Sequence, residues 1–169
     1  TYGAEVTIVE LLPRLVPNED TEISRQLERA FTKQGINSMT GARVDGVDIT
    51  DSQATVSIST ADDGISVECD KVLVAVGVQG NVEDIGLETV AVHTKMGFIV
   101  VNDRMQTSVP NIYAVGDVTG KLALAHVASA QGVTAVETMA GLEPPVLDYS
   151  LMPRAIYCRP QVASFGLTE

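Results

Sequence analysis

The chain has 169 residues, of which 45% are hydrophobic, and a formal net charge of −11. This length suits about one globular domain, and the negative charge argues against nucleic acid or an anionic membrane as a partner. The longest uncharged run, residues 122–136, is too short and too polar to cross a bilayer. Cys69 and Cys158 fit no metal-binding or CxxC pattern, so we expect reduced, half-buried thiols in a cytosol-like compartment.

The N-terminal part predicts a strand and then an amphipathic helix. The β-branched run in VTIVE predicts a buried parallel strand that closes at Glu10. A carboxylate at the end of such a strand can accept hydrogen bonds from the adenosine ribose of a dinucleotide; the alternative is a solvated strand-end charge. Residues 19–34 predict a helix capped by Asn18, with an apolar face made of Ile23, Leu27, Ala30 and Phe31.

Residues 41–77 predict a β-meander that returns to the main sheet. Val44, Val47 and Ile49 form one apolar set, and two further segments, residues 54–58 and 65–69, alternate apolar and polar residues. They are followed at residues 72–76 by a continuous apolar run, which is typical of a strand buried on both faces and which stops at Gly77. A further strand is expected at residues 98–101.

The stretch TSVPNIYAVGDVTG, residues 107–120, predicts a loop, a short buried strand at residues 112–115 and an abrupt turn at Gly116 and Asp117. Glycine lets the backbone approach a ligand, and a carboxylate just past a strand suits sugar or polyol hydroxyls. The alternative is that Asp117 caps the following helix, expected over residues 121–141.

This stretch, followed by LALAHVASAQG, resembles the second flavin-binding motif of the FAD-dependent pyridine nucleotide–disulfide oxidoreductases. Within that family the wording is most similar to the dihydrolipoyl dehydrogenase branch, of the cyanobacterial and plastid type. The resemblance implies an α/β fold built from parts of FAD/NAD(P)-binding Rossmann-like domains, with a β-meander and the start of an α+β dimerisation domain. It divides the chain into an NAD-binding part at residues 1–79, an FAD-binding part at 80–146 and the dimerisation part at 147–169.

The resemblance also implies which residues contact the two cofactors. For NAD, Glu10 would bind the ribose, the backbone near Val44 would border the adenine, and Gly77 would lie beside the nicotinamide nucleotide. We interpret Val44 first as core with an incidental adenine contact, and His126 as a helix-start residue that packs and hydrogen-bonds locally in preference to a catalytic base. No catalytic residue and no metal ligand is expected in this chain. The residues implied for FAD are Gly116, Asp117, Ala123, Leu124, Ala125 and His126.

The implied parent enzyme oxidises dihydrolipoamide, carried on lipoyl domains of 2-oxoacid dehydrogenase complexes, and passes the electrons through a redox disulfide and FAD to NAD. It would be a homodimer of the cytoplasm or the plastid stroma. The family's CxxxxC pair and C-terminal catalytic His are not found in this sequence, so we expect an internal piece that does not turn over alone. Two alternatives stay open: another superfamily enzyme, such as glutathione reductase, mercuric reductase or an NADH oxidase, and a non-catalytic nucleotide-binding module.

Overall fold

The computed structural model describes residues 2–61 and 63–168. The chain divides into two compact units, one made of Thr1–Ala75 with Ala155–Glu169 and the other of Val76–Arg154. The mixed helix and sheet content confirms the expected α/β class with a Rossmann-like character. The domain limits at residues 79/80 and 146/147 stay predictions, and their outer ends, residues 1 and 169, lie outside the described residues.

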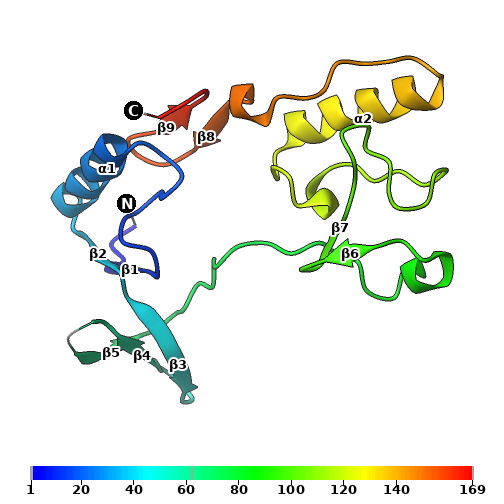
Figure 1. The fold of residues 1–169 in the computed structure, drawn as a ribbon. Helices are drawn as coiled ribbons and strands as arrows, with labels where there is room; N and C mark the ends of the chain where they lie inside the picture. The colour runs from blue at the N-terminus through cyan, green and yellow to red at the C-terminus, as the bar shows by residue number, and fades with distance from the viewer. Residues whose placement is uncertain (1, 62, 169) are drawn as a thin grey trace. The chain divides into compact units, whose positions relative to one another are not determined.

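The first unit contains a strand–helix–strand arrangement (Figure 1). Strand β1 (Val6–Glu10) pairs in parallel with β2 (Ile36–Thr40), and α1 (Thr21–Lys33) connects them. This confirms the predicted strand and helix, but β1 is only partly buried, and on α1 Ile23 is exposed while Ser24 is buried beside Leu27. The N-cap of α1 is Asp20, two residues later than the expected Asn18, because the Asp20 carboxylate accepts a hydrogen bond from the Glu22 N–H at 2.8 Å.

The same unit contains the predicted meander, an antiparallel sheet in the order β3 (Arg43–Ile49), β4 (Ala54–Ser59) and β5 (Gly64–Cys69). Strand β4 buries every second residue, as its alternating sequence predicts. Its side chains Val56 and Ile58 form a small core with Ala42, against which Val9 of β1 packs. The meander is thereby attached directly to the parallel pair.

The second unit is mainly loops and short helices around one apolar cluster. It holds a small hairpin and one long helix. One residue from each, Ile99 and Ala135, joins loop residues in the apolar cluster Val92, Ile99, Val101, Met105, Ala114 and Ala135. The elements of this unit and of the chain's C-terminal part are η1 (Leu87–Val90), β6 (Thr94–Lys95), β7 (Phe98–Ile99), η2 (Asp117–Thr119), α2 (Ala125–Met139), η3 (Tyr149–Leu151), β8 (Arg154–Ile156) and β9 (Val162–Ser164) (Figure 1).

Two predicted strands do not form. Residues 72–76 are irregular and exposed, with Leu73 at 90% and Val76 at 94% of full exposure. Residues 112–115 make only an isolated bridge between Tyr113 and Gln106. A strand persists where a neighbour satisfies its backbone groups, and neither segment has a paired strand beside it in the described part of the chain.

Other boundaries are shorter than predicted. The strand expected at residues 98–101 is limited to Phe98–Ile99, and the helix expected from residue 121 begins at Ala125. Cys69 and Cys158 are free and partly buried, as predicted. Within residues 2–61 and 63–168, no helix combines the length and the apolar character needed to cross a bilayer.

Candidate functional site

The centre of the candidate site is the turn formed by Gly116 and Asp117. Gly116 has φ 81° and ψ −158°, a conformation that side-chain-bearing residues rarely adopt. A Cβ at this position would lie 3.4 Å from the Cβ of Ala128, so the turn is packed closely against the first part of α2. Glycine therefore lets the chain reverse at this point while it touches the helix.

Asp117 presents an open carboxylate on this turn. The side chain is exposed, and no group in the described residues hydrogen-bonds its oxygens. The N-cap of α2 is Leu124, seven positions away in sequence, and neither η2 nor α2 receives a side-chain capping bond. No hydrogen bond therefore supports a capping role for Asp117, whereas the exposed carboxylate is accessible to an external hydroxyl.

The start of α2 supplies donors near this turn. Leu124 is extended, with φ −138° and ψ 139°, and offers no side-chain acceptor to the first helical N–H groups. These N–H groups have no helix carbonyl one turn earlier to accept their hydrogen bonds. The Ala128 N–H, one turn further on, does have such a partner: it donates to the Leu124 carbonyl at 3.0 Å. Ala123, Ala125 and His126 are exposed beside them. The helix start thus combines free donors with a partial positive charge.

Two residues that the sequence does not predict as site residues stabilise the turn through hydrogen bonds to the Gly116 backbone. Gln131 of α2 is fully buried, and its Oε1 accepts a hydrogen bond from the Gly116 N–H at 2.6 Å. Thr119 donates to the Gly116 carbonyl, with its hydroxyl at 2.8 Å and its N–H at 3.0 Å. The sequence does offer a signal for Gln131, because it lies on the same helix face as Val127 and Ala135. A polar side chain on a buried face needs a hydrogen-bond partner.

In the first unit, Glu10 and Val44 lie on neighbouring elements. The Glu10 Oε1 accepts a hydrogen bond from the Leu12 N–H at 2.8 Å, while its carbonyl accepts one from the Ala42 N–H at 3.0 Å. Val44 is 45% exposed on β3 and does not belong to the buried cluster, so the plain-core interpretation of this residue is wrong. The second oxygen of Glu10 has no hydrogen-bond partner in the part of the chain that the structure describes.

Gly77 lies in the irregular segment that follows residues 72–76. Its φ of +124° is again one that favours glycine, and a Cβ would meet no heavy atom within 4 Å. The structure therefore brings the Gly116, Asp117 and α2 residues together, and separately Glu10 with Val44. Gly77 stands apart from the other implied NAD residues along the chain, in the unit that begins at Val76.

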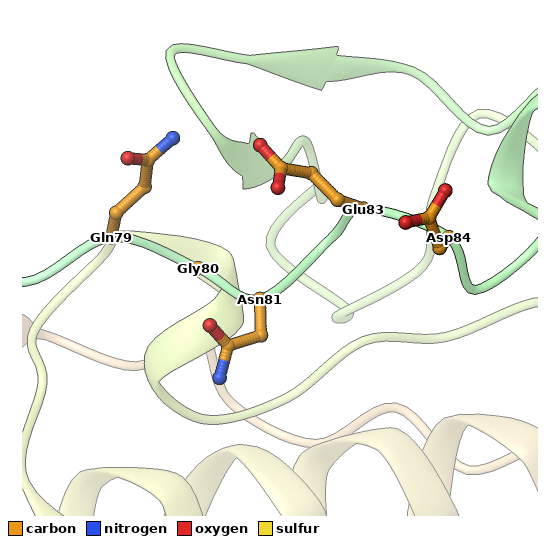
Figure 2. A pocket seen from close by; sticks show the side chains of 5 residues that line it. All are labelled: Gln79, Gly80, Asn81, Glu83 and Asp84. Atoms are coloured by element: carbon orange, nitrogen blue, oxygen red, sulfur yellow. The ribbon is translucent and has the colours of Figure 1, made fainter.

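A shallow polar hollow of about 300 Å³ lies along the segment that follows Gly77, lined by Gln79, Gly80, Asn81, Glu83 and Asp84. Figure 2 shows that the Asn81 side chain points to the opposite side of the chain from Gln79 and Glu83. A Cβ on Gly80 would lie 2.5 Å from the Gly97 carbonyl oxygen and 3.5 Å from the Val118 Cα. The segment is thus wedged between the β6–β7 hairpin and η2, which is a packing role. In the described residues no group of acidic, His or Cys side chains is arranged to hold a metal ion.

The comparisons with known proteins agree with one another. The family model described as Pyridine nucleotide-disulphide oxidoreductase matches residues 1–132. The chain is 51% identical over 170 residues to a dihydrolipoyl dehydrogenase of Mycobacterium leprae and 45% identical over 170 residues to one of Bacillus subtilis, with 99% of the chain and 36% of each relative covered.

Solved structures give the same picture. LpdA from Mycobacterium tuberculosis superimposes with a TM-score of 0.88 at 30% identity, covering 98% of this chain and 36% of that one. The HOCl-induced flavoprotein disulfide reductase RclA from Escherichia coli gives a TM-score of 0.85 at 25% identity, covering 99% and 38%. The chain therefore spans little more than a third of the length of the curated relatives that it matches.

Proposed function

Because the chain belongs to the pyridine nucleotide-disulphide oxidoreductases, we propose that it contributes cofactor-contacting surfaces to a dihydrolipoyl dehydrogenase. The observation that carries this proposal is the 51% identity to the M. leprae dihydrolipoyl dehydrogenase, which extends over 99% of the chain. The same relatives are almost three times as long, so the activity proposed is that of the full-length protein.

The residues around the Gly116–Asp117 turn fit FAD. The open carboxylate of Asp117 would accept a hydrogen bond from a ribityl hydroxyl, and the free N–H groups at the start of α2 would face an electron-rich oxygen of the flavin. The backbone of Ala123, Leu124, Ala125 and His126 forms this helix start. When bound, FAD supplies the hydride and electron-transfer chemistry; these residues bind and orient it.

The first unit and the segment after it fit NAD. Glu10 ends β1 with one carboxylate oxygen uncommitted, which suits an adenosine ribose hydroxyl. The exposed Val44 is available for adenine contact, and the glycine conformation of Gly77 allows close approach of the nicotinamide nucleotide. We assign these three residues to the NAD site of the full-length protein.

The proposed substrate is dihydrolipoamide carried on lipoyl domains, and the proposed assembly is a homodimer in the cytoplasm. The names of the curated relatives support the substrate. A second candidate, a flavoprotein disulfide reductase with another substrate, is favoured by the TM-score of 0.85 to RclA. The lower identity of 25% to that protein, against 51% to the dehydrogenase, places it second. Comparing kcat/KM for dihydrolipoamide with that for other disulfide or dithiol substrates separates the two.

The flavin assignment is tested with Asp117→Ala in the full-length protein. Losing a hydrogen bond to a charged acceptor costs about 1.5–3 kcal/mol, so we expect FAD affinity to fall about ten- to a hundredfold. The dissociation constant is measured by titrating flavin-free protein with FAD and following flavin fluorescence. Asp103→Ala, which removes an exposed carboxylate outside the turn, is the matched control. Equal FAD affinity in wild type and Asp117→Ala would remove Asp117 from the flavin site.

A further inference from the structure

We propose that Gln131 is a positioning residue for flavin binding, acting on the backbone of Gly116 and not on the cofactor itself. This inference rests on the proposed flavin site at the Gly116–Asp117 turn. Gln131 lies in the middle of α2, away from both the start of that helix and the Asp117 carboxylate.

The amide of Gln131 is buried and bonded at both ends. The side chain is 0% exposed, its Oε1 accepts from the Gly116 N–H at 2.6 Å, and its Nε2 donates to the Tyr149 hydroxyl at 3.1 Å. Burying a polar amide is unfavourable unless its hydrogen bonds are made, and an apolar residue would serve α2 packing at lower cost. The presence of glutamine here therefore points to the two bonds.

The first bond selects the conformation of Gly116. A glycine at φ 81° and ψ −158° has many alternative conformations, and an acceptor fixed on a rigid helix favours the one that directs its N–H toward α2. The Gly116 carbonyl is held in turn by the Thr119 hydroxyl at 2.8 Å. Both backbone groups of Gly116 are thus committed, while the carboxylate of the next residue, Asp117, is not. The turn is pre-organised and its ligand-facing group is left free.

The second bond fixes the amide itself. Tyr149 is the first residue of η3, which is capped by Asp148; the Ser150 hydroxyl and N–H hydrogen-bond the Asp148 carboxylate and lower its pKa. Lys121 lies with its Nζ 5.8 Å from the centre of the Tyr149 ring, which is a cation–π distance. Gln131 therefore joins three segments of one unit: the turn, α2 and η3.

The test uses the full-length protein and three substitutions. Gln131→Leu removes both bonds and leaves the partly buried Gly116 N–H without its partner, so we expect FAD affinity to fall about tenfold or more. Gln131→Glu keeps an oxygen for the Gly116 N–H and can accept the Tyr149 O–H, so we expect FAD affinity within about threefold of wild type. Tyr149→Phe removes only the second bond and should lie between the two.

Thr134→Ala is the matched control, because Thr134 is buried on the same face of α2 but does not hydrogen-bond Gly116. Thr134→Ala should lower the melting temperature of the flavin-free protein without changing its FAD affinity. If Gln131 were merely structural, Gln131→Leu would likewise lower the melting temperature and leave FAD affinity unchanged. If Gln131→Leu does not fold, Gln131→Asn decides, because the shorter amide stays polar but does not reach the Gly116 N–H.

The outcomes are distinguishable from those of the flavin assignment. If Asp117→Ala weakens FAD binding and Gln131→Leu or Gln131→Asn binds FAD like wild type, the role of Gln131 is overturned and the flavin site stands. If Asp117→Ala binds FAD like wild type, the flavin site and the inference built on it both fall.

Discussion

Among single residues, Glu10 governs the proposed choice between NAD and NADP. Its carboxylate ends β1, where an adenosine ribose is expected. The 2′-hydroxyl of NAD can donate to this carboxylate, whereas the 2′-phosphate of NADP meets a like charge that costs several kcal/mol. We therefore expect kcat/KM of the full-length enzyme to favour NADH over NADPH by about a hundredfold or more, and Glu10→Gln to narrow that ratio.

A nearby arginine could counteract this effect by binding the phosphate. Arg14 is the candidate, four residues beyond Glu10, but its Nη2 donates to the Pro17 carbonyl at 2.8 Å within the loop. Measuring both nucleotides with wild type, Glu10→Gln and Arg14→Ala separates the contributions. A wild type that uses NADPH as well as NADH, or an unchanged ratio in Glu10→Gln, would contradict the assignment of Glu10.

At the level of elements, Gly120 limits the shape of the η2 turn that carries Asp117. It ends η2 with φ +64°, and a Cβ there would lie 2.6 Å from the Phe98 ring. Gly120→Ala combines an unfavourable backbone conformation with overpacking, which typically costs about 1–3 kcal/mol. We expect a lower melting temperature of the full-length protein. Gly64→Ala, where a Cβ would meet nothing within 4 Å, is the control; equal melting temperatures for the two variants would show that the turn can adjust.

The elements that sequence predicts well are those whose strand or helix partners are present in this chain. The strand at VTIVE, the helix around Leu27 and the alternation in β4 form as predicted. Burial is predicted less well, because β1 is only partly buried and Ile23 of the expected apolar face is exposed. The runs at residues 72–76 and 112–115 carry equally strong β-strand composition, yet they are irregular because strand pairing depends on residues far away in sequence. The turn motif predicts Asp117 as a site residue, whereas the bond between Gln131 and Gly116 depends on how α2 is rotated, which the small-apolar sequence of that helix does not specify.

For the whole molecule, the prediction concerns turnover. We expect the purified 169-residue chain to lack both dihydrolipoamide and diaphorase activity. Its two cysteines, Cys69 and Cys158, are free and lie 89 positions apart in sequence, so the chain supplies no closely spaced redox pair. Activity is assayed with dihydrolipoamide and NAD, and with NADH and a dye acceptor, beside the full-length enzyme at equal concentration. Turnover that coelutes with the 169-residue chain would contradict this expectation.

The exposed apolar run at residues 72–76 has the composition of a segment that is prone to aggregate. Short, uncharged, β-prone segments of this kind stack readily into intermolecular sheets, and Leu73 and Val76 are almost fully accessible. Asp70 and Lys71 precede the run directly, the position in which gatekeeper charges slow such stacking. The two charges that precede the run are therefore placed to oppose intermolecular stacking while the run is exposed.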